Sequence, residues 1–222
     1  MTTPISDATS SAPQPKAESF VDWFHLNSRL VMYAGIGVIV VALGIWIVQR
    51  TSLNATMNSE KQLQIAKQSL NTGNLPLAQS DLKKVVDKYG EKPAGAEAGM
   101  LLAQIQFDKG DFQAAVVGLT DLAKKIGNDP NAAPVTSLLG DAQMQLNKAA
   151  EAAVQYEKAA SLTPLQGQRN FYMSKAGRAY LAAGNAAQAR KVFEALANQT
   201  SNDGSSVEAR VRLGEMVGGG KA

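Results

Sequence analysis

The chain has 222 residues, no cysteine, and a net charge of +3 from 22 Lys and Arg against 19 Asp and Glu. This balance leaves no concentrated basic patch for nucleic acid, and the lysine pairs at 83–84 and 124–125 are typical of solvated helix surfaces. The absence of thiols excludes disulfides, thiol catalysis and covalent haem attachment, and the single histidine, His25, excludes an imidazole cluster for metal binding or acid–base catalysis.

The N-terminal region divides into two parts. Residues 1–17 are rich in Ser, Thr, Pro and small residues, which cannot bury a core, so we expect a disordered tail. Residues 18–29 are expected to form a short helix, and four of them share one face of it: Phe20, Trp23, Phe24 and Asn27. Such an aromatic face suits a membrane interface. The segment can also be a plain helical extension of the apolar segment after it, and the two interpretations are compatible.

The segment 30–48, LVMYAGIGVIVVALGIWIV, contains 19 residues without a charge. As a helix rising 1.5 Å per residue it would span about 28 Å, close to the roughly 30 Å hydrocarbon core of a bilayer. Arg29 and Arg50 bracket the segment, and Tyr33 and Trp46 stand near its two ends. Because a buried core helix of this length would normally carry a polar face, the sequence predicts a single transmembrane helix.

Four residues at three- and four-residue steps share one side of this helix: Ala34, Gly37, Val41 and Gly44. Small residues let another helix approach closely in lipid, so this side is a candidate docking face for a membrane partner. The alternative is that glycine is simply common in such helices. Positively charged residues are nearly balanced between the two flanks, so charge alone does not set the orientation.

The rest of the chain predicts serial helices in antiparallel pairs after a polar juxtamembrane link at 49–58. We expect the pairs at 59–72 with 76–89, 96–109 with 112–126, 134–147 with 149–162, and 170–183 with 186–198. A last helix at 205–217, with Ser205 and Glu208 in the spacing of a capping box, would cover the open edge of the final pair. Residues 218–222 are expected to form a flexible tail.

A period of 37 residues relates these pairs. It aligns small residues in the first helices (Ala66, Ala103, Gly140, Gly177 and Gly214) with small residues in the second helices (Ala78, Ala115, Ala152 and Ala189). Small residues let two helix axes cross at about 8–10 Å. Larger residues are expected to fill the seam: Leu82, Leu119, Tyr156 and Phe193, then Val85, Leu122, Ala159 and Leu196. The turn position holds residues that tolerate left-handed backbone: Gly73, Gly110, Asn147 and Gly184.

This pattern resembles the tetratricopeptide repeat (TPR). The third unit matches it through Leu139, Gly140, Ala152, Tyr156, Ala159 and Pro164, and the fourth through Gly177, Tyr180, Gly184, Asn185, Ala189 and Phe193. The first two units lack the aromatic residue and the closing proline. The period exceeds the usual 34 residues by three, and we expect the extra residues to lengthen the loops at 90–95, 127–133 and 163–168. The resemblance implies an all-α fold: a transmembrane helix, then an α-solenoid at 59–217 of about four helix pairs and a capping helix.

No P-loop, dinucleotide-binding glycine pattern, GxSxG or HExxH occurs, so we expect no enzymatic activity, cofactor or metal. Binding of other proteins is the better-supported role. In TPR superhelices the first helix of each pair lines the concave face, and here an apolar stripe follows the small positions by four residues: Leu70, Phe107, Met144 and Leu181. The residues one step after the small positions differ in charge: Lys67, Gln104, Asp141 and Arg178. Together these eight form a candidate groove for hydrophobic protein segments, and the alternative is that they only pack against the next unit.

The whole arrangement resembles the ancillary subunit of the bacterial SecYEG translocon. The resemblance covers about 18–217 and is carried by the approach from Glu18 to Arg29, the single span and the immediate entry into repeats. It implies an inner-membrane protein with a cytoplasmic N-terminus and a periplasmic repeat domain. The implied partners are membrane lipid, translocon subunits, and periplasmic chaperones or unfolded clients. Two alternatives remain: an accessory or assembly subunit of another membrane complex, respiratory or photosynthetic, and a cell-envelope or division scaffold.

Overall fold

The computed structural model describes residues 28–127, 129–199 and 203–218, and every regular element in those ranges is an α-helix. The chain divides between Leu53 and Asn54 into two compact units, and helix α2 (Ser28–Asn71) contributes residues to both. The second unit continues with α3 (Leu75–Tyr89), α4 (Pro93–Asp108), α5 (Phe112–Lys125), α6 (Ala132–Gln145), α7 (Ala149–Leu162), α8 (Gln166–Ala182), α9 (Ala186–Ala197) and α10 (Gly204–Gly218). The predicted tail 1–17, most of the predicted segment 18–29, and 219–222 lie outside the described residues.

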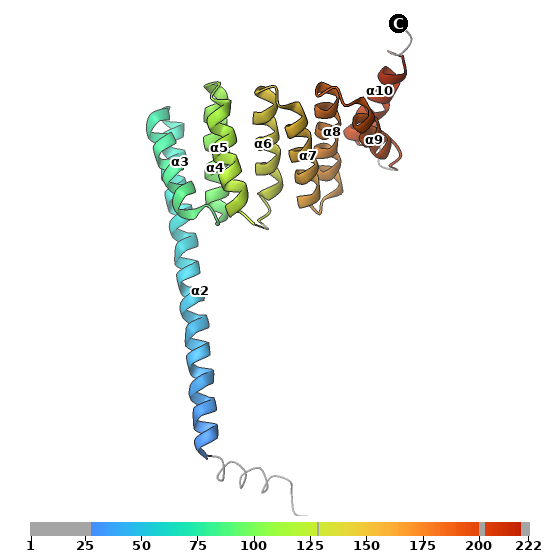
Figure 1. Ribbon diagram of the computed structural model, residues 1–222. Coiled ribbons are helices and arrows are strands. Elements are labelled where there is room, and N and C mark those ends of the chain that lie inside the picture. The colour runs from blue at the N-terminus through green and yellow to red at the C-terminus, as the bar shows by residue number, and fades with distance from the viewer. Residues whose placement is uncertain (1–27, 128, 200–202, 219–222) are drawn as a thin grey trace, which may run out of the picture. The chain divides into compact units, whose positions relative to one another are not determined.

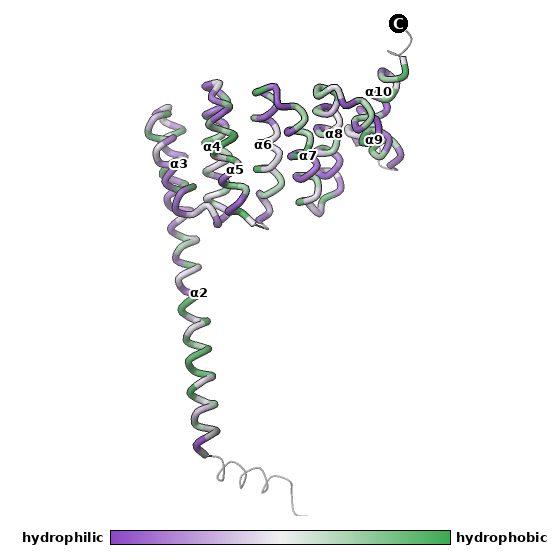
Figure 2. Tube along the Cα trace, viewed as in Figure 1, coloured by the Kyte–Doolittle hydropathy of each residue, from purple (hydrophilic) through white to green (hydrophobic). Residues whose placement is uncertain are grey.

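The N-terminal compact unit, which ends at Leu53, contains the apolar part of α2, and Figure 2 shows this part as mostly hydrophobic. The described side chains from Met32 to Arg50 are all exposed, including Val38 at 69% and Val40 at 61%. By length and composition this helix could cross a membrane, and none of its apolar window is buried in protein. The core helix of a soluble protein and a signal sequence near the N-terminus pass the same test of length and composition.

The C-terminal compact unit is a solenoid in which each helix packs on the next in chain order, from α3 to α10 (Figure 1). Below, the helix pairs of this solenoid are numbered as repeat units one to four. The predicted helix pairs are confirmed. Their boundaries differ from the prediction by four residues or fewer, except that the first helix, predicted to begin at residue 59, is the C-terminal part of α2. Residues 49–58, predicted as a link, are helical and belong to α2. Helices α4, α6 and α8 begin inside the segments predicted as long loops, so part of the extra length of each repeat extends its first helix.

All eight small residues predicted at the crossings within the pairs are buried. In the third and fourth units the first helix has glycine there, because an aromatic ring of the second helix lies against it. A Cβ atom at Gly140 would lie 2.7 Å from Cε1 of Tyr156, and one at Gly177 would lie 2.6 Å from Cε1 of Phe193. In the first two units alanine occupies the position, and a buried leucine, Leu82 or Leu119, replaces the ring. The space at each crossing is therefore filled jointly by two residues sixteen positions apart, either glycine with an aromatic ring or alanine with leucine.

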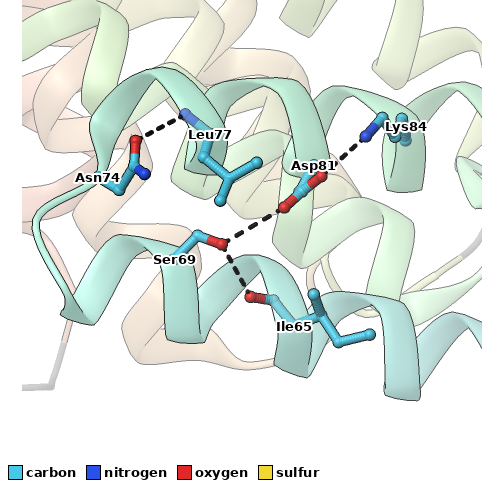
Figure 3. A network of polar contacts seen from close by, with 6 residues as sticks. All are labelled: Ile65, Ser69, Asn74, Leu77, Asp81 and Lys84. Carbon is cyan, nitrogen blue, oxygen red and sulfur yellow. Dashed lines mark hydrogen bonds and ion pairs between the residues drawn. The ribbon is translucent and has the colours of Figure 1, made fainter.

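The turn inside each pair has the left-handed backbone that the sequence predicted. The φ angles are +74° at Gly73, +72° at Gly110, +59° at Asn147 and +74° at Gly184. After each of the three glycines, the next side chain caps the second helix by accepting a backbone N–H at 3.2 Å (Asn74 from Leu77, Asp111 from Ala114, Asn185 from Gln188). In the first unit this cap stands next to a polar link between the paired helices, where Ser69 Oγ donates to Asp81 at 3.4 Å and Lys84 binds the other carboxylate oxygen (Figure 3).

Helix α10 covers the apolar end of the last pair, as predicted for a capping helix. Ala209 is fully buried, and Leu213 and Met216 are half-buried against the cluster around Phe193. The predicted capping box is wrong. Asp203, rather than Ser205, accepts the N–H of Ser206 at 2.9 Å, and Glu208 turns away to accept the Ser174 hydroxyl of α8 at 2.5 Å.

The shared volume at the crossing leads to a prediction for Gly177. We expect Gly177→Ala to lower the free energy of unfolding by about 1–3 kcal/mol, because the new methyl group would overlap the Phe193 ring. We expect Phe193→Leu to relieve much of that loss in the double variant, since it restores the alanine–leucine combination of the first two units. Urea unfolding of the four chains of the double-mutant cycle measures the coupling. The control is Gly118→Ala in α5, an exposed helical glycine with nothing within 4 Å of its Cβ position, which should stabilise slightly. Additive losses with no coupling would contradict the explanation.

Candidate functional site

The predicted apolar stripe lies at the seams between helices. Leu70, Phe107, Met144 and Leu181 are all half-buried, and each packs against a core cluster of its own unit or of the adjoining units. Phe107 also meets Phe112 edge-on, with ring centroids 5.6 Å apart. Much of the apolar surface of these side chains is therefore buried in packing contacts, and only a part of it is accessible to a ligand.

The charged positions next to the small residues connect the first helices of successive units. Lys67 of α2 pairs with Glu97 of α4 at 2.5 Å, Asp141 of α6 pairs with Lys175 of α8 at 2.6 Å, and Arg178 of α8 pairs with Glu208 of α10 at 3.5 Å. Gln104 of α4 instead bonds to Asp108 of its own helix at 3.0 Å. These pairs form a ladder of ionic contacts along the first helices, and the step from α4 to α6 lacks one. We call this surface the first-helix face.

Asp141 binds two residues, Tyr156 and Lys175, at once. The Tyr156 hydroxyl donates to one of its carboxylate oxygens at 2.6 Å, and the ammonium of Lys175 contacts both oxygens. Burial and the hydrogen bond to Asp141 raise the pKa of Tyr156 far above its usual range, so this phenol stays protonated and remains a donor. Lys175 also donates to Ser137 at 3.0 Å. The cluster thus joins both helices of the third unit to the first helix of the fourth.

An exposed aromatic residue that the sequence analysis missed lies next to this cluster. Phe171 of α8 is 51% exposed, stacks edge-on with Tyr172, and has the Lys175 ammonium 5.5 Å from its ring centroid. One signal could have identified it. Its repeat position holds Glu60, Glu97, Pro134 and Glu208 in the other units. At this position Glu97 and Glu208 form ion pairs with basic residues of the preceding repeat unit. At Phe171 the corresponding residue of the preceding unit is the acidic Asp141, which would repel a glutamate.

The predicted docking face of α2 is exposed within the N-terminal compact unit. Ala34, Gly37, Val41 and Gly44 are exposed, and a Cβ atom at Gly37 or Gly44 would meet no other atom within 4 Å.

Two further features bear on chemistry. No cluster of three His, Cys, Asp or Glu side chains able to hold a metal ion occurs among the described residues. A cavity of about 330 Å³ lies between α7, α8 and α9, and its lining includes Glu157, Tyr180 and Lys191. Burial and a hydrogen bond to Glu157 raise the pKa of Tyr180, which makes that phenol a hydrogen-bond donor rather than a base.

Comparison with protein families gives two adjoining matches. Residues 53–175 match a family model described as a tetratricopeptide repeat-like domain, and residues 174–217 match one described as a tetratricopeptide repeat. The chain belongs to the tetratricopeptide repeat-like family. TPR proteins generally act as scaffolds that bind other proteins rather than as enzymes, and the serial pairs described above are the TPR architecture.

Solved structures support the TPR fold. A putative kinesin light chain from Podospora anserina with nearly identical TPR-like repeats is 20% identical with a TM-score of 0.56, and covers 73% of this chain and 87% of its own. A tetratricopeptide repeat protein from Parabacteroides merdae is 17% identical with a TM-score of 0.56, covering 72% and 60%. The protein MamA is 23% identical with a TM-score of 0.51, covering 71% and 81%. A search of curated proteins found no match.

The Asp141 cluster predicts a stability difference between two lysines of this TPR solenoid. We expect Lys175→Met to lower the free energy of unfolding by about 1.5–3 kcal/mol, because it removes a charged hydrogen bond at a site where the Lys175 side chain is only 15% exposed. The matched control is Lys83→Met, which breaks the pair of Lys83 with Asp87, whose side chains are 67% and 58% exposed. That loss should be under about 0.5 kcal/mol. Equal losses in urea unfolding would contradict a special role for Lys175.

Proposed function

We propose that the chain is a membrane-anchored TPR protein that binds other proteins at the membrane surface. The observation that carries the proposal is helix α2, whose run of exposed apolar side chains from Met32 to Val48 leads without a break into the first repeat helix at Leu63 and Ala66. Exposed apolar surface of this extent needs a covering, and a bilayer supplies one of the right thickness. The indole of Trp46 lies under Arg50 at 5.8 Å, an arrangement suited to the interface between hydrocarbon and headgroups.

Membrane anchoring can be tested by extraction at alkaline pH. The wild-type chain should stay in the membrane pellet, and the double variant Ile39→Arg with Val40→Arg should move to the soluble fraction. Each arginine at the centre of the span costs about 2.5–3.5 kcal/mol. The control, Ser52→Arg with Leu53→Arg, adds the same charge beyond the apolar run and should leave the chain in the pellet. Release of the wild-type chain together with peripheral proteins would contradict the anchor.

The finer part of the proposal concerns location and partners. The resemblance to the ancillary translocon subunit supports an inner-membrane protein with a cytoplasmic N-terminus and periplasmic repeats, which links exported polypeptides to chaperones. A tether of this kind raises the effective concentration of the repeats near the exit channel, so weak contacts suffice. Protease added to intact spheroplasts should digest the repeats but not an N-terminal tag, and the reverse pattern would contradict this orientation.

The first-helix face around Phe171 is the proposed binding surface for these partners. Phe171 is the largest exposed apolar side chain described on the first helices of the solenoid, and exposed aromatic residues beside charged ones commonly dominate binding. The half-exposed edges of Phe107 and Met144 would extend the surface toward α4 and α6.

Binding through this face predicts a selective loss of partners. After crosslinking in native membranes, we expect Phe171→Ala to reduce recovery of water-soluble partners about 10-fold or more. The matched control is Val117→Ala on α5, which truncates a side chain that is 62% exposed on a second helix. Thermal unfolding of both variants checks that the fold is intact. Unchanged recovery would remove the first-helix face from the proposal.

The open docking face of α2 favours a second candidate, an accessory or assembly subunit whose span packs into another membrane complex. Here Gly37→Leu should reduce recovery of membrane-embedded partners while soluble partners remain. Mass spectrometry of the recovered partners separates the candidates. Translocon subunits and chaperones support the first, respiratory or photosynthetic subunits support the second, and envelope or division proteins would indicate a scaffold.

A further inference from the structure

The cavity between α7, α8 and α9 lies away from the first-helix face. Tyr180, which lines it, follows Phe171 by about two and a half helical turns, so the two side chains leave α8 on opposite sides. Most of the remaining lining comes from the second helices α7 and α9. The volume of about 330 Å³ falls within the roughly 300–1,000 Å³ of small-molecule sites. The cavity is therefore a candidate site separate from the proposed protein-binding surface.

One change in the repeat pattern accounts for the space. Ala195 occupies a position that holds a charged side chain in the three preceding second helices: Lys84, Asp121 and Lys158. The short side chain of Ala195 leaves room that a longer one would occupy. Met173 and Val192 line this room with apolar surface, and Val192 is only 5% exposed. The cavity thus has an apolar floor.

Two opposite charges line the same cavity. Glu157 of α7 is half-buried and accepts a hydrogen bond from the Tyr180 phenol, which orients its carboxylate. Lys191 of α9 is exposed at the rim. In the part of the chain that the structure describes, neither of these two charged groups forms an ion pair. Both are therefore available to a ligand.

This pair of charges is particular to the boundary between the third and fourth units. The positions equivalent to Glu157 and Lys191 hold Thr120 with Val154 at one preceding boundary, and Lys83 with Val117 at the other. Neither combination offers two opposite charges. The charged lining is thus a local feature and not a requirement of the repeat.

The two charges select a ligand that carries both signs. A simple cation would be attracted to Glu157 but repelled by Lys191, and a simple anion would meet the reverse. A zwitterion satisfies both groups, and an apolar part would gain from burial on the floor of the cavity. Among small molecules, α-amino acids with apolar side chains combine an ammonium, a carboxylate and an apolar group in this way.

We propose that the cavity binds an α-amino acid with an apolar side chain. Its ammonium lies at Glu157 and its carboxylate at Lys191. Its side chain packs on Met173, Val192 and Ala195. This inference goes beyond the proposed function and does not depend on it, because the first-helix face lies on the other side of α8.

Phenylalanine and three derivatives test the selection by charge. The full-length chain, in micelles of an uncharged detergent at about pH 6, is labelled with ¹³C at its seven methionine methyl groups, and Met173→Leu assigns the Met173 resonance. L-phenylalanine should shift that resonance saturably, whereas Met144 on the first-helix face should not shift. N-acetylphenylalanine is an anion, phenylalaninamide a cation at this pH, and N-acetylphenylalaninamide neutral. Each should need an about 10-fold or more higher concentration, because it lacks at least one charged hydrogen bond.

Substitutions assign each charge of the ligand to its partner. Glu157→Gln should remove the preference for phenylalanine over N-acetylphenylalanine, and Lys191→Met should remove the preference for phenylalanine over phenylalaninamide. The matched controls, Glu151→Gln and Lys158→Met, change exposed charges of α7 outside the cavity lining and should leave both preferences intact. Thermal unfolding verifies that all four variants are folded.

Four results would overturn the inference: no saturable shift of Met173, equal half-saturation by the four compounds, an equal shift of Met144, or a preference for the zwitterion that survives in both cavity variants. Each of them leaves the proposed function intact, since Phe171→Ala tests that function separately.

Discussion

The solenoid depends on the close crossing of two helices at one small residue on each. Four times along the chain, an alanine or glycine of a first helix and an alanine of the second are buried at the positions expected for a close crossing, and residues this small let the two backbones come near. The larger seam residues, the turns with left-handed backbone and the stacking of one unit on the next all depend on that spacing.

The first-helix face shows how a repeated scaffold acquires a local character. In the first and fourth units a basic residue reaches the next first helix, whereas in the third unit the sign is reversed and Asp141 meets Lys175. The reversal brings Lys175 over the ring of Tyr156, 4.8 Å from its centroid, and leaves the neighbouring repeat position free of glutamate. Phe171 takes that position and is exposed beside charged groups. An exposed aromatic side chain thus lies where the ionic ladder changes sign.

The helices, their pairing, the crossing residues and the turn backbone could be predicted from the sequence, because each depends on local residue types repeated at a fixed period. The starts of α4, α6 and α8 could not, since proline and small residues read equally well as loop or as the first turn of a helix. Spacing alone favours Ser205 as the cap of α10, because it cannot show that Glu208 has a stronger partner in α8. Likewise, the apolar stripe at Leu70, Phe107, Met144 and Leu181 is visible as a pattern, but its division between packing and exposure depends on neighbouring units. Phe171 was missed because the argument for an aromatic residue at its position depends on the charge of Asp141, which lies on another helix.

The division of volume between glycine with an aromatic ring and alanine with leucine has a consequence for how this protein can change over time. Its four units look alike in backbone but are not interchangeable modules. A recombination event that joined the first helix of the second unit to the second helix of the fourth would set the methyl group of Ala103 against the ring of Phe193, and the reverse chimera would leave a void beside Leu119. Duplication or loss of whole units keeps matched partners together and avoids both faults. Gene rearrangements in this chain should therefore be tolerated at the boundaries between pairs and selected against within them.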